Sequence, residues 1–361
     1  MQDLTIESPV GDWPDLIMRL GGAEKIAALA REHGAFLRAR GVKSELDLLR
    51  LIFAYAPGGR SLRVTAAEAA ACGIADVSDV ALLDRFRRCA DWLTALCETV
   101  LAASLPPGDG GFAQSVRLVD ASRIEGPGRS GARLHLCYDA GRQRIADFVV
   151  TPLSEGEKLD RVKIRAGEIE LGDRGYPQPD ALANARAAGA DVLVRLTWNS
   201  LKLRDQTGED LDWMALFAKV DQAGSLDIPV TVHKPRGRFV PLPLRLVMVP
   251  KPPEAAQTAR RIARNTARKD QRRIDPRTLR AAGYLILITS LDATAFPPET
   301  LAALYRVRWQ IELAFKRLKS ILHLDRLPAK DPGLAKTWIT AHLLLALLID
   351  QTEAELADIP P

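Results

Sequence analysis

Four polar side chains in residues 305–319, YRVRWQIELAFKRLK, have the chemistry that the handling of a phosphodiester requires. A carboxylate can hold a metal ion, arginine and lysine can hold phosphates, and tyrosine can stack or form a hydrogen bond. If the segment is one helix, residues turn by about 100° each, and Tyr305, Arg308, Glu312 and Lys319 fall within an arc of roughly 60°. Apolar residues take the opposite side. The alternative is a solvated helix face whose charges form only weak surface ion pairs.

Two aspartates directly follow predicted apolar strands, Asp120 in VRLVDAS and Asp173 in IELGDRGY. Each alone is more often a turn-former. If the two strand ends are neighbours and the helix of Glu312 packs beside them, three carboxylates converge and repel one another unless a cation lies between them. Hard oxygen ligands with open positions suit Mg²⁺ or Mn²⁺. Two such ions could activate a water or a 3′-hydroxyl and stabilise the leaving oxygen of a phosphodiester.

A sheet flanked by helices must position these carboxylates. Alternating or apolar stretches predict strands within residues 115–122, where the strand ends at Asp120, and over residues 132–139, 144–152, 167–173 and 190–197. Helical patterns cover residues 157–166 and 179–188. Three strands, helix, strand, helix, strand is the order of the ribonuclease H-like (retroviral-integrase-like) fold. We therefore expect a mixed α/β catalytic core.

The remaining regions divide the chain around that core. Residues 1–105 predict an all-helical, DNA-end-binding domain, followed by a Pro/Gly linker at 105–111. Two helical stretches, 65–72 and 78–92, are compatible with a helix-turn-helix, although any helical hairpin looks similar. Its second helix would present three arginines to DNA, namely Arg85, Arg87 and Arg88.

The core itself is interrupted. We expect its first part at residues 112–196, an insertion of mixed character at 197–291, the helix of Glu312 within 292–328, and a helical tail at 329–361. Within the insertion, residues 259–280 carry nine Arg or Lys against two Asp. That density suits a phosphate backbone, and it equally suits a mobile solvated segment.

Composition points to a soluble cytoplasmic protein. A net charge of +5 permits a polyanionic partner without demanding one. The acidic amino terminus lacks the basic and apolar regions of a signal peptide. The apolar run AHLLLALLID is too short to cross a bilayer, which predicts a buried helix and no membrane partner. The four cysteines show no metal or disulfide spacing and are expected to pack as small apolar residues.

Several of these motifs resemble one family. The spacing Y-x2-R-x3-E-x6-K, with the flanking RWQIE-x-x-FK-x-LK, matches the signature of bacterial insertion-sequence DDE transposases of the YREK group. VDAS resembles the family's first-Asp segment, DRGY its second, and TPLSEGEKL the intervening stretch that carries a Glu, here Glu157. The likeness covers roughly residues 118–324, and a segment near residues 62–86 is similar to the helical amino-terminal domain of some members.

The resemblance implies a function and a set of residue roles. Such enzymes bind a divalent metal, Mg²⁺ or Mn²⁺, and the resemblance implies two such ions here. They act as a homodimer on terminal inverted repeats and target DNA. Carried over by position, the catalytic and metal-binding residues would be Asp120, Asp173 and Glu312. The residues that grip terminal phosphates or a distorted end nucleotide would be Tyr305, Arg308 and Lys319, assisted by Arg195. The sites of action would be the cytoplasm and the nucleoid.

The sequence also departs from the family. Ala-Ser follows Asp120 where the family often has Gly-Thr. Some members stack an extruded base on a Trp of the insertion domain, and the chain has none between Trp213 and Trp309. Three aromatic residues could substitute, namely Phe239, Tyr284 or Trp198.

Two other functions fit the same residues. A catalytically inactive or repurposed transposase would remain a sequence-specific DNA-binding protein. A ribonuclease H-like metal-dependent nuclease would cleave without strand joining.

Overall fold

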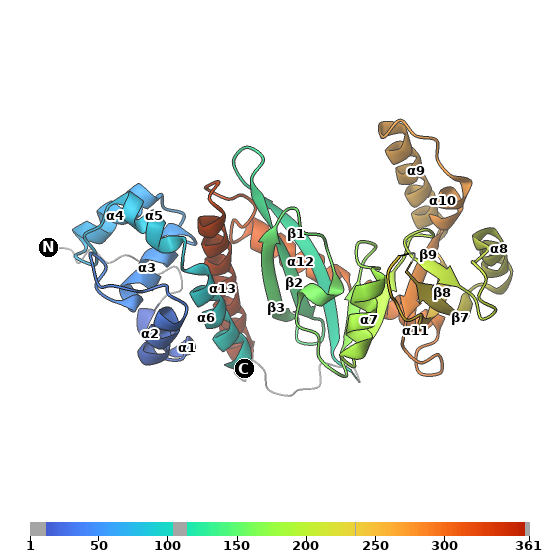
Figure 1. Cartoon of the computed structure of the whole chain (residues 1–361), viewed down its shortest axis with the longest axis horizontal. Coiled ribbons are helices and arrows are strands. Elements are labelled where there is room, and N and C mark those ends of the chain that lie inside the picture. The colour runs from blue at the N-terminus through green and yellow to red at the C-terminus, as the bar shows by residue number, and fades with distance from the viewer. Residues whose placement is uncertain (1–11, 104–113, 235, 358–361) are drawn as a thin grey trace.

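The computed structural model describes residues 12–103, 114–234 and 236–357. The predicted linker at 105–111 and the amino-terminal residues 1–11 lie outside them. The molecule is elongated: amino-terminal helices lie at one end, a sheet occupies the middle, and an Arg-rich helix projects at the other end (Figure 1).

Six helices form the amino-terminal part, as the helical patterns predict. They are α1 (Trp13–Arg19), α2 (Ala23–Glu32), α3 (Glu45–Tyr55), α4 (Leu62–Ala71), α5 (Asp79–Phe86) and α6 (Ala90–Ala103). Serine hydroxyls at the N-caps of α3, α4 and α5 accept backbone N–H hydrogen bonds. The single helix predicted over 78–92 is wrong, because the chain turns between Phe86 and Ala90. Phe86 and Trp92 would point to different sides of one straight helix, and the turn lets both be fully buried.

The predicted arginines of this hairpin make contacts within the protein. Arg85 donates to the carbonyl of Arg40, and Arg88 Nε donates to the carbonyl of Asp84 at 3.2 Å. Arg87 pairs with Asp84 at 3.0 Å and with Asp331 at 2.9 Å. Arg87 therefore ties the amino-terminal helices to the carboxyl-terminal part of the chain.

One sheet of nine strands runs through the rest of the chain in the order β3-β2-β1-β4-β5-β9-β8-β7-β6. The strands predicted in the core are present as β1 (Val116–Glu125), β2 (Gly131–Asp139), β3 (Arg144–Pro152), β4 (Ile169–Gly172) and β5 (Asp191–Arg195). β1, β4 and β5 are parallel, and the other pairs are antiparallel.

The helix predicted over residues 157–166 is wrong. Only a short 3₁₀ turn, η1 (Leu159–Arg161), forms there, and Lys158 and Val162 on either side are extended. The Lys163 N–H donates to the carboxylate of Asp147 on β3 at 2.7 Å, which holds the segment along the sheet. A tertiary hydrogen bond thus replaces the local helical pattern.

The region predicted as an insertion joins the same sheet. Its strands are β6 (Lys202–Arg204), β7 (Leu226–His233), β8 (Leu242–Pro250) and β9 (Tyr284–Thr289). β9 pairs antiparallel with β5, as in Val194↔Ile288. Its helices are α8 (Trp213–Ala223), α9 (Pro253–Lys269) and α10 (Pro276–Ala281). The domain boundaries themselves stay a prediction.

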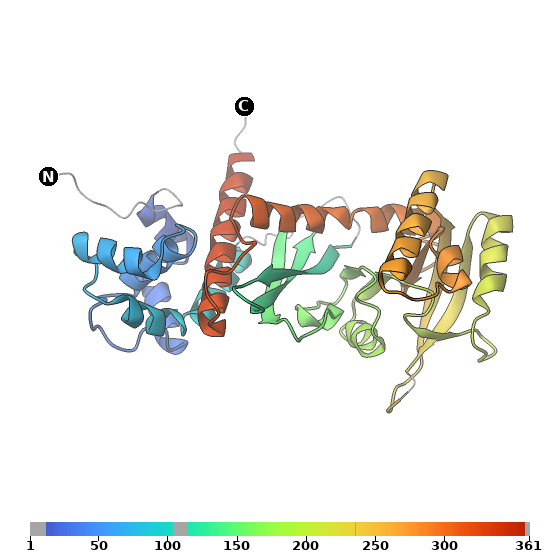
Figure 2. The same ribbon diagram turned by 90° about the horizontal axis from the view of Figure 1, so that it is seen from above.

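Helices cover both faces of this sheet. α11 (Pro298–Arg306) and α12 (Trp309–Ser320) run end to end along one face, and α7 (Pro179–Ala187) lies on the other (Figure 2). Two apolar clusters correspond to these faces: one joins α11, α12 and the amino-terminal helices to the sheet, and the other gathers α7 and α8.

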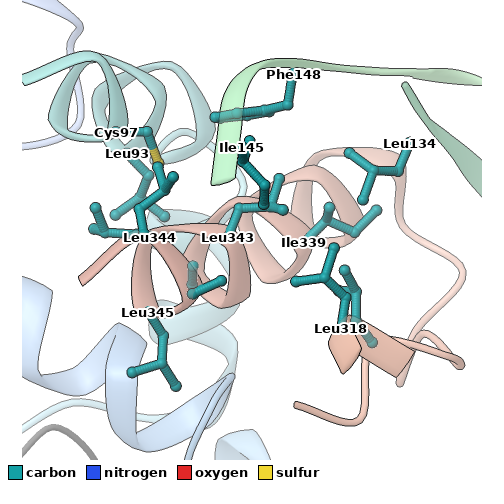
Figure 3. Packing of buried hydrophobic residues seen from close by; sticks show 14 of the residues in the cluster. Leu93, Cys97, Leu134, Ile145, Phe148, Leu318, Ile339, Leu343, Leu344 and Leu345 are labelled. Carbon is teal, nitrogen blue, oxygen red and sulfur yellow. The ribbon is translucent and has the colours of Figure 1, made fainter. Parts of the chain in front are cut away.

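The last helix, α13 (Pro332–Ala357), lies between the amino-terminal helices and the sheet. Leu344 lies beside Leu93 and Cys97 of α6, whereas Leu343 lies beside Ile145 of β3 (Figure 3). The predicted buried helix is therefore present, but it is much longer than the apolar run that indicated it. By length and composition it could cross a membrane, yet 78% of its most apolar window is buried inside the protein, as in a core helix.

Because Leu343 is completely buried, we expect Leu343→Ala to lower the free energy of unfolding by about 2–5 kcal/mol through lost burial and a residual cavity. Urea unfolding followed by circular dichroism measures the change. The control is Leu37→Ala, at a side chain 65% exposed, which should change stability by less than about 0.5 kcal/mol. Equal losses in the two variants would contradict the placement of α13.

Candidate active site

The register of the parallel strands brings the two predicted aspartates together. β1 pairs with β4 up to Val119↔Gly172, and Asp120 and Asp173 directly follow these two residues along the chain. The prediction that the strand ends at Asp120 is wrong, because β1 continues to Glu125 by pairing with β2. What ends at Asp120 is the parallel ladder, so the two aspartates occupy one edge of the parallel part of the sheet.

Burial controls the ionisation of Asp120. Desolvation raises the pKa of Asp120 to about 6; the negative charges of Asp173 and Glu157 raise it too, and Arg308 lowers it. Asp120 Oδ1 accepts the N–H of Ala121 at 2.8 Å, which also favours the carboxylate. A partly buried carboxylate with two acidic neighbours needs a cation near it.

Arg308 supplies a cation from the junction of two helices. The single helix predicted over 305–319 is wrong: α11 ends at Arg306, and α12 begins at Trp309. Between them the hydrogen bonds tighten to the i→i+3 pattern, as from Gln310 N–H to the Val307 carbonyl at 3.0 Å. The two helices remain end to end, with Arg308 at the junction.

Arg308 links two of the predicted carboxylates. Its guanidinium lies 3.8 Å from Asp120 Oδ2 and forms a short ion pair with Glu312. The side chains of Arg308 and Asp120 are 17% and 21% exposed, whereas that of Glu312 is 58% exposed. Glu312 therefore lies on the solvent-exposed side of the site. Arg308 contacts both its carboxylate and that of Asp120.

Glu157 is a further carboxylate of this region, to which sequence reasoning assigned no role. Its side chain pairs with Arg133 at 3.2 Å. A Cβ at Gly175 would lie 2.3 Å from Glu157 Oε2 and 3.4 Å from Asp173 Oδ1, so this glycine lets the two carboxylates approach the turn after β4. The only signal in the sequence was the family motif, because the approach depends on a tertiary contact.

The other predicted phosphate-binding residues lie in two different parts of the structure. Tyr305 is buried; desolvation raises its pKa, and the nearby cations Arg308 and Arg195 lower it. Lys319 lies at the far end of α12, where its Nζ donates to the carbonyl of Arg123 on β1 at 3.2 Å. Tyr305, Arg308 and Arg195 are thus grouped near the aspartates, whereas Lys319 lies along the continuation of β1.

A cationic cavity of about 430 Å³ adjoins Arg195. Arg174, which follows Asp173, and Lys251, which follows β8, also line it. Desolvation, together with the positive charges of Arg195, Arg174 and Arg260, lowers the pKa of Lys251 to about 8. Clustered cations without enough carboxylate partners form a site for anions.

Two of the three candidate aromatic residues, Trp198 and Tyr284, line this cavity, and Trp198 does so in a polar setting. Trp198 donates its indole N–H to Thr278 Oγ1 at 3.0 Å, and the Arg277 guanidinium lies 4.0 Å from its ring centre. Tyr284 is buried and stacked on Phe217 at 5.1 Å between ring centres. Phe239 packs at the edge of the second apolar cluster.

The donor set suits a hard divalent cation, because Asp120 and Asp173 are neighbouring carboxylates whose charges repel. Within residues 12–103, 114–234 and 236–357, however, no three Asp, Glu, His or Cys side chains are close enough to hold a metal ion. Glu312 is directed to Arg308 instead. Asp120 and Asp173 fit such an ion in chemistry, and Glu312 would fit it only if its carboxylate turned away from Arg308.

These features define an enzyme that acts on phosphodiesters, and comparison with known proteins agrees. Residues 111–349 match the family described as Transposase DDE domain. The chain is 39% identical over 355 residues to InsL of insertion sequence element IS186A of Escherichia coli, covering 97% of this chain and 96% of that protein. It is 38% identical over 356 residues to the transposase for IS421 of Escherichia coli, with the same coverage.

More distant relatives are also found. The transposase for IS231E of Bacillus thuringiensis subsp. finitimus is 22% identical over 259 residues, which is 63% of this chain and 54% of that protein. A structure of the piggyBac transposase synaptic complex with hairpin DNA aligns with a TM-score of 0.45 and 10% identity over 98% of this chain and 77% of that one. That structural likeness is too weak to carry an argument.

The chain belongs to the DDE transposase family, and it is a DNA transposase. A DDE domain implies dependence on divalent metal.

The raised pKa of Asp120 makes stability depend on pH. A native pKa of about 6 against an ordinary value of 3.8 means that the folded protein binds this proton more tightly than the unfolded chain. The stabilisation is complete below about pH 4 and is lost as the pH rises through 6. With EDTA present, we expect Asp120→Asn to be more stable than the parent by about 1–3 kcal/mol at pH 8 and nearly equal at pH 4.

Thermal unfolding at the two pH values measures this difference. Asp76→Asn, at an exposed aspartate, is the control and should show none. If Asp120→Asn were less stable than the parent at pH 8, the Arg308 ion pair would outweigh burial, and the assignment of the raised pKa would be wrong.

Proposed function

We propose that this transposase belongs to the YREK group and catalyses cut-and-paste transposition. It would bind the terminal inverted repeats of an insertion sequence, cleave the DNA there and join the ends to a target. The single observation that carries this proposal is the register Val119↔Gly172, which makes Asp120 and Asp173 neighbours, with Arg308 linking Glu312 to Asp120. The spacing of Tyr305, Arg308, Glu312 and Lys319 supports it.

A ribonuclease H-like core is part of the proposal. The strand order β3-β2-β1-β4-β5, with β1, β4 and β5 parallel, agrees with that fold. The helix of Glu312 packs against β1 from the face opposite α7. The inserted strands would extend the core sheet without separating its catalytic residues.

Asp120, Asp173 and Glu312 would hold two divalent ions, Mg²⁺ or Mn²⁺. Such ions supply an activated water or 3′-hydroxyl and stabilise the leaving oxygen. Glu157, held by Arg133, would add negative charge that strengthens cation binding. The burial that raises the pKa of Asp120 also strengthens its interaction with any cation, because the local dielectric is low.

Arg308 would have two roles. A cation bound by Asp120 and Glu312 competes with Arg308 for both carboxylates. The guanidinium, released from these partners, could then hold a phosphate in the bidentate manner that arginine favours. Arg195 and Tyr305 lie near it and would hold the same terminal phosphates, and Lys319 would contact DNA farther along α12.

The other regions would serve assembly on DNA. Residues 1–105 would bind the DNA ends, residues 112–196 and 292–328 would form the catalytic core, and residues 329–361 would brace it. The active form would be a homodimer on paired ends. The protein would work in the bacterial cytoplasm at the nucleoid.

We expect Asp120→Asn, Asp173→Asn and Glu312→Gln each to reduce cleavage of the DNA ends by about 100-fold or more, since each removes a cation ligand. The assay follows a labelled fragment that contains an end flanking the encoding gene, with Mg²⁺, Mn²⁺ or EDTA. Binding of the fragment should persist in every variant.

Glu299→Gln is the matched control, because Glu299 is an exposed acidic residue of α11. It should cleave like the parent. Variants that all cleave as well as the parent would refute the assignment of the three carboxylates. Binding by the parent without cleavage under any metal condition would favour an inactive DNA-binding protein, and cleavage without joining to a target would favour a nuclease.

Trp198 is the aromatic residue that we propose for contact with a distorted end nucleotide, because it lies in the cationic cavity beside Arg195 and is only partly buried. Tyr284 also lines the cavity, but it is buried and stacked on Phe217. We expect Trp198→Leu to lower the fluorescence of a 2-aminopurine placed at the terminal nucleotide. Without the indole the extruded base loses its stacking partner, so it stacks in the duplex more often, where its fluorescence is weaker. Phe239→Leu is the control and should leave the signal unchanged. The opposite pattern would assign the contact to Phe239.

A further inference from the structure

Helix α9 presents a row of arginines on its exposed side. Arg261, Arg264 and Arg268 are all exposed and follow the spacing i, i+3, i+7, which places them within an arc of roughly 60°. Ala256 and Ala267 of the same helix are buried. The helix is therefore anchored through small apolar residues and directs its charge away from the protein.

The charge of this row is not neutralised by the protein. Among the ion pairs of the residues that the structure describes, none involves Arg261, Arg264 or Arg268. Asp270, at the end of α9, pairs with Arg272 at 3.3 Å. A merely solvated helix face usually mixes both signs of charge, because like charges at this spacing repel. A row of one sign suits a polyanion.

The inner side of α9 connects the row to the active site. Arg260 lies so close to Gly283 that a Cβ there would be 2.6 Å from its Nη2. Arg260 acts electrostatically on Lys251, which lines the cationic cavity with Arg195 and Arg174. Positive charge thus extends from the aspartates through the cavity to α9.

The position of α9 in the molecule indicates which part of the DNA would lie along this line of positive charge. α9 projects at the end of the molecule opposite the amino-terminal helices (Figure 1). Between them lie β1, which contains Asp120, and β4, which Asp173 directly follows. DNA whose element side is held by the amino-terminal helices and whose end lies at Asp120 and Asp173 continues toward α9 on the far side of the cleaved bond.

We propose that the arginine row of α9 binds the phosphate backbone of the duplex DNA that flanks the cleaved bond outside the element. This proposal rests on the proposed function, because it needs a DNA end in the site. The contact would be with phosphates, so it would be independent of the flanking sequence and strongly dependent on salt.

The test compares binding of two DNA fragments in EDTA, where no cleavage occurs. One fragment carries the end with about 20 base pairs of flanking duplex, roughly two helical turns, and the other stops at the end. The variant is Arg261→Gln with Arg264→Gln and Arg268→Gln. The control, Lys163→Gln with Lys202→Gln and Lys219→Gln, removes three exposed positive charges elsewhere.

Fluorescence anisotropy between 50 and 200 mM salt gives the dissociation constant and its salt slope. We expect the α9 variant to bind the flanked fragment about 10-fold or more weakly, with a slope smaller by about 2–3, since three phosphate contacts are lost. Binding of the unflanked fragment should be unchanged, and the control should match the parent on both. Circular dichroism melts establish that the variants are folded.

Other outcomes would overturn the proposal. An unchanged affinity for the flanked fragment, or an equal loss on both fragments, would remove flanking DNA as the occupant. Binding of the parent but not the α9 variant to phosphatidylserine vesicles, with DNA binding unaffected, would assign the row to an anionic membrane instead. If the parent bound neither fragment, the proposed function would fail as well, whereas binding without later cleavage would leave the α9 result valid.

Discussion

Burial of α13 on two sides is the constraint on which the arrangement of the molecule depends. A helix that is apolar on nearly all sides is stable in water only if two partners cover it. Here α6 and its neighbours cover one side, and β2, β3 and α12 cover another. Each fully buried leucine contributes about 1.5–3 kcal/mol, so the amino-terminal helices and the sheet are held together through α13.

Polar contacts at α13 give this apolar association a defined geometry. Thr337 donates to the carbonyl of Phe86 at 2.6 Å, and Lys336 pairs with Asp91 at 2.8 Å. Dispersion contacts alone would tolerate sliding along the helix, whereas these bonds fix its position relative to α5 and α6. The helix of Glu312 packs against the same α13. The amino-terminal helices, for which we propose binding of the DNA ends, and the candidate active site therefore both pack against α13.

Much of the fold could be predicted from local patterns. The five strands between Val116 and Arg195 alternate or are continuously apolar, and each is present. The predicted helix at 157–166 fails because the hydrogen bond from Lys163 to Asp147 joins segments that are distant along the chain. The pairing of β9 with β5 is equally non-local, which is why residues 197–291 predict a mixed insertion and not the continuation of one sheet.

The candidate site was predictable in its residue types and less so in its geometry. The strand-end positions of Asp120 and Asp173 indicated that they could meet, and the register places them side by side. Periodicity alone could not show the tightened junction at Arg308, because no glycine or proline marks it. It also could not show that Tyr305 would be buried or that Glu157 would approach Gly175, since both follow from packing.

The junction between α11 and α12 connects the packing of the chain to its electrostatics. α11 packs against β8 and α12 packs against β1, so the two helices together extend along the sheet from one strand to the other. The hydrogen bonds tighten at their junction, and the Arg308 guanidinium there lies 3.8 Å from Asp120 Oδ2. The cation beside the partly buried Asp120 thus comes from the junction of the two helices. A charge held at this helix junction can exchange partners without any rearrangement of the core, as the binding of metal ions and phosphates that we propose would require.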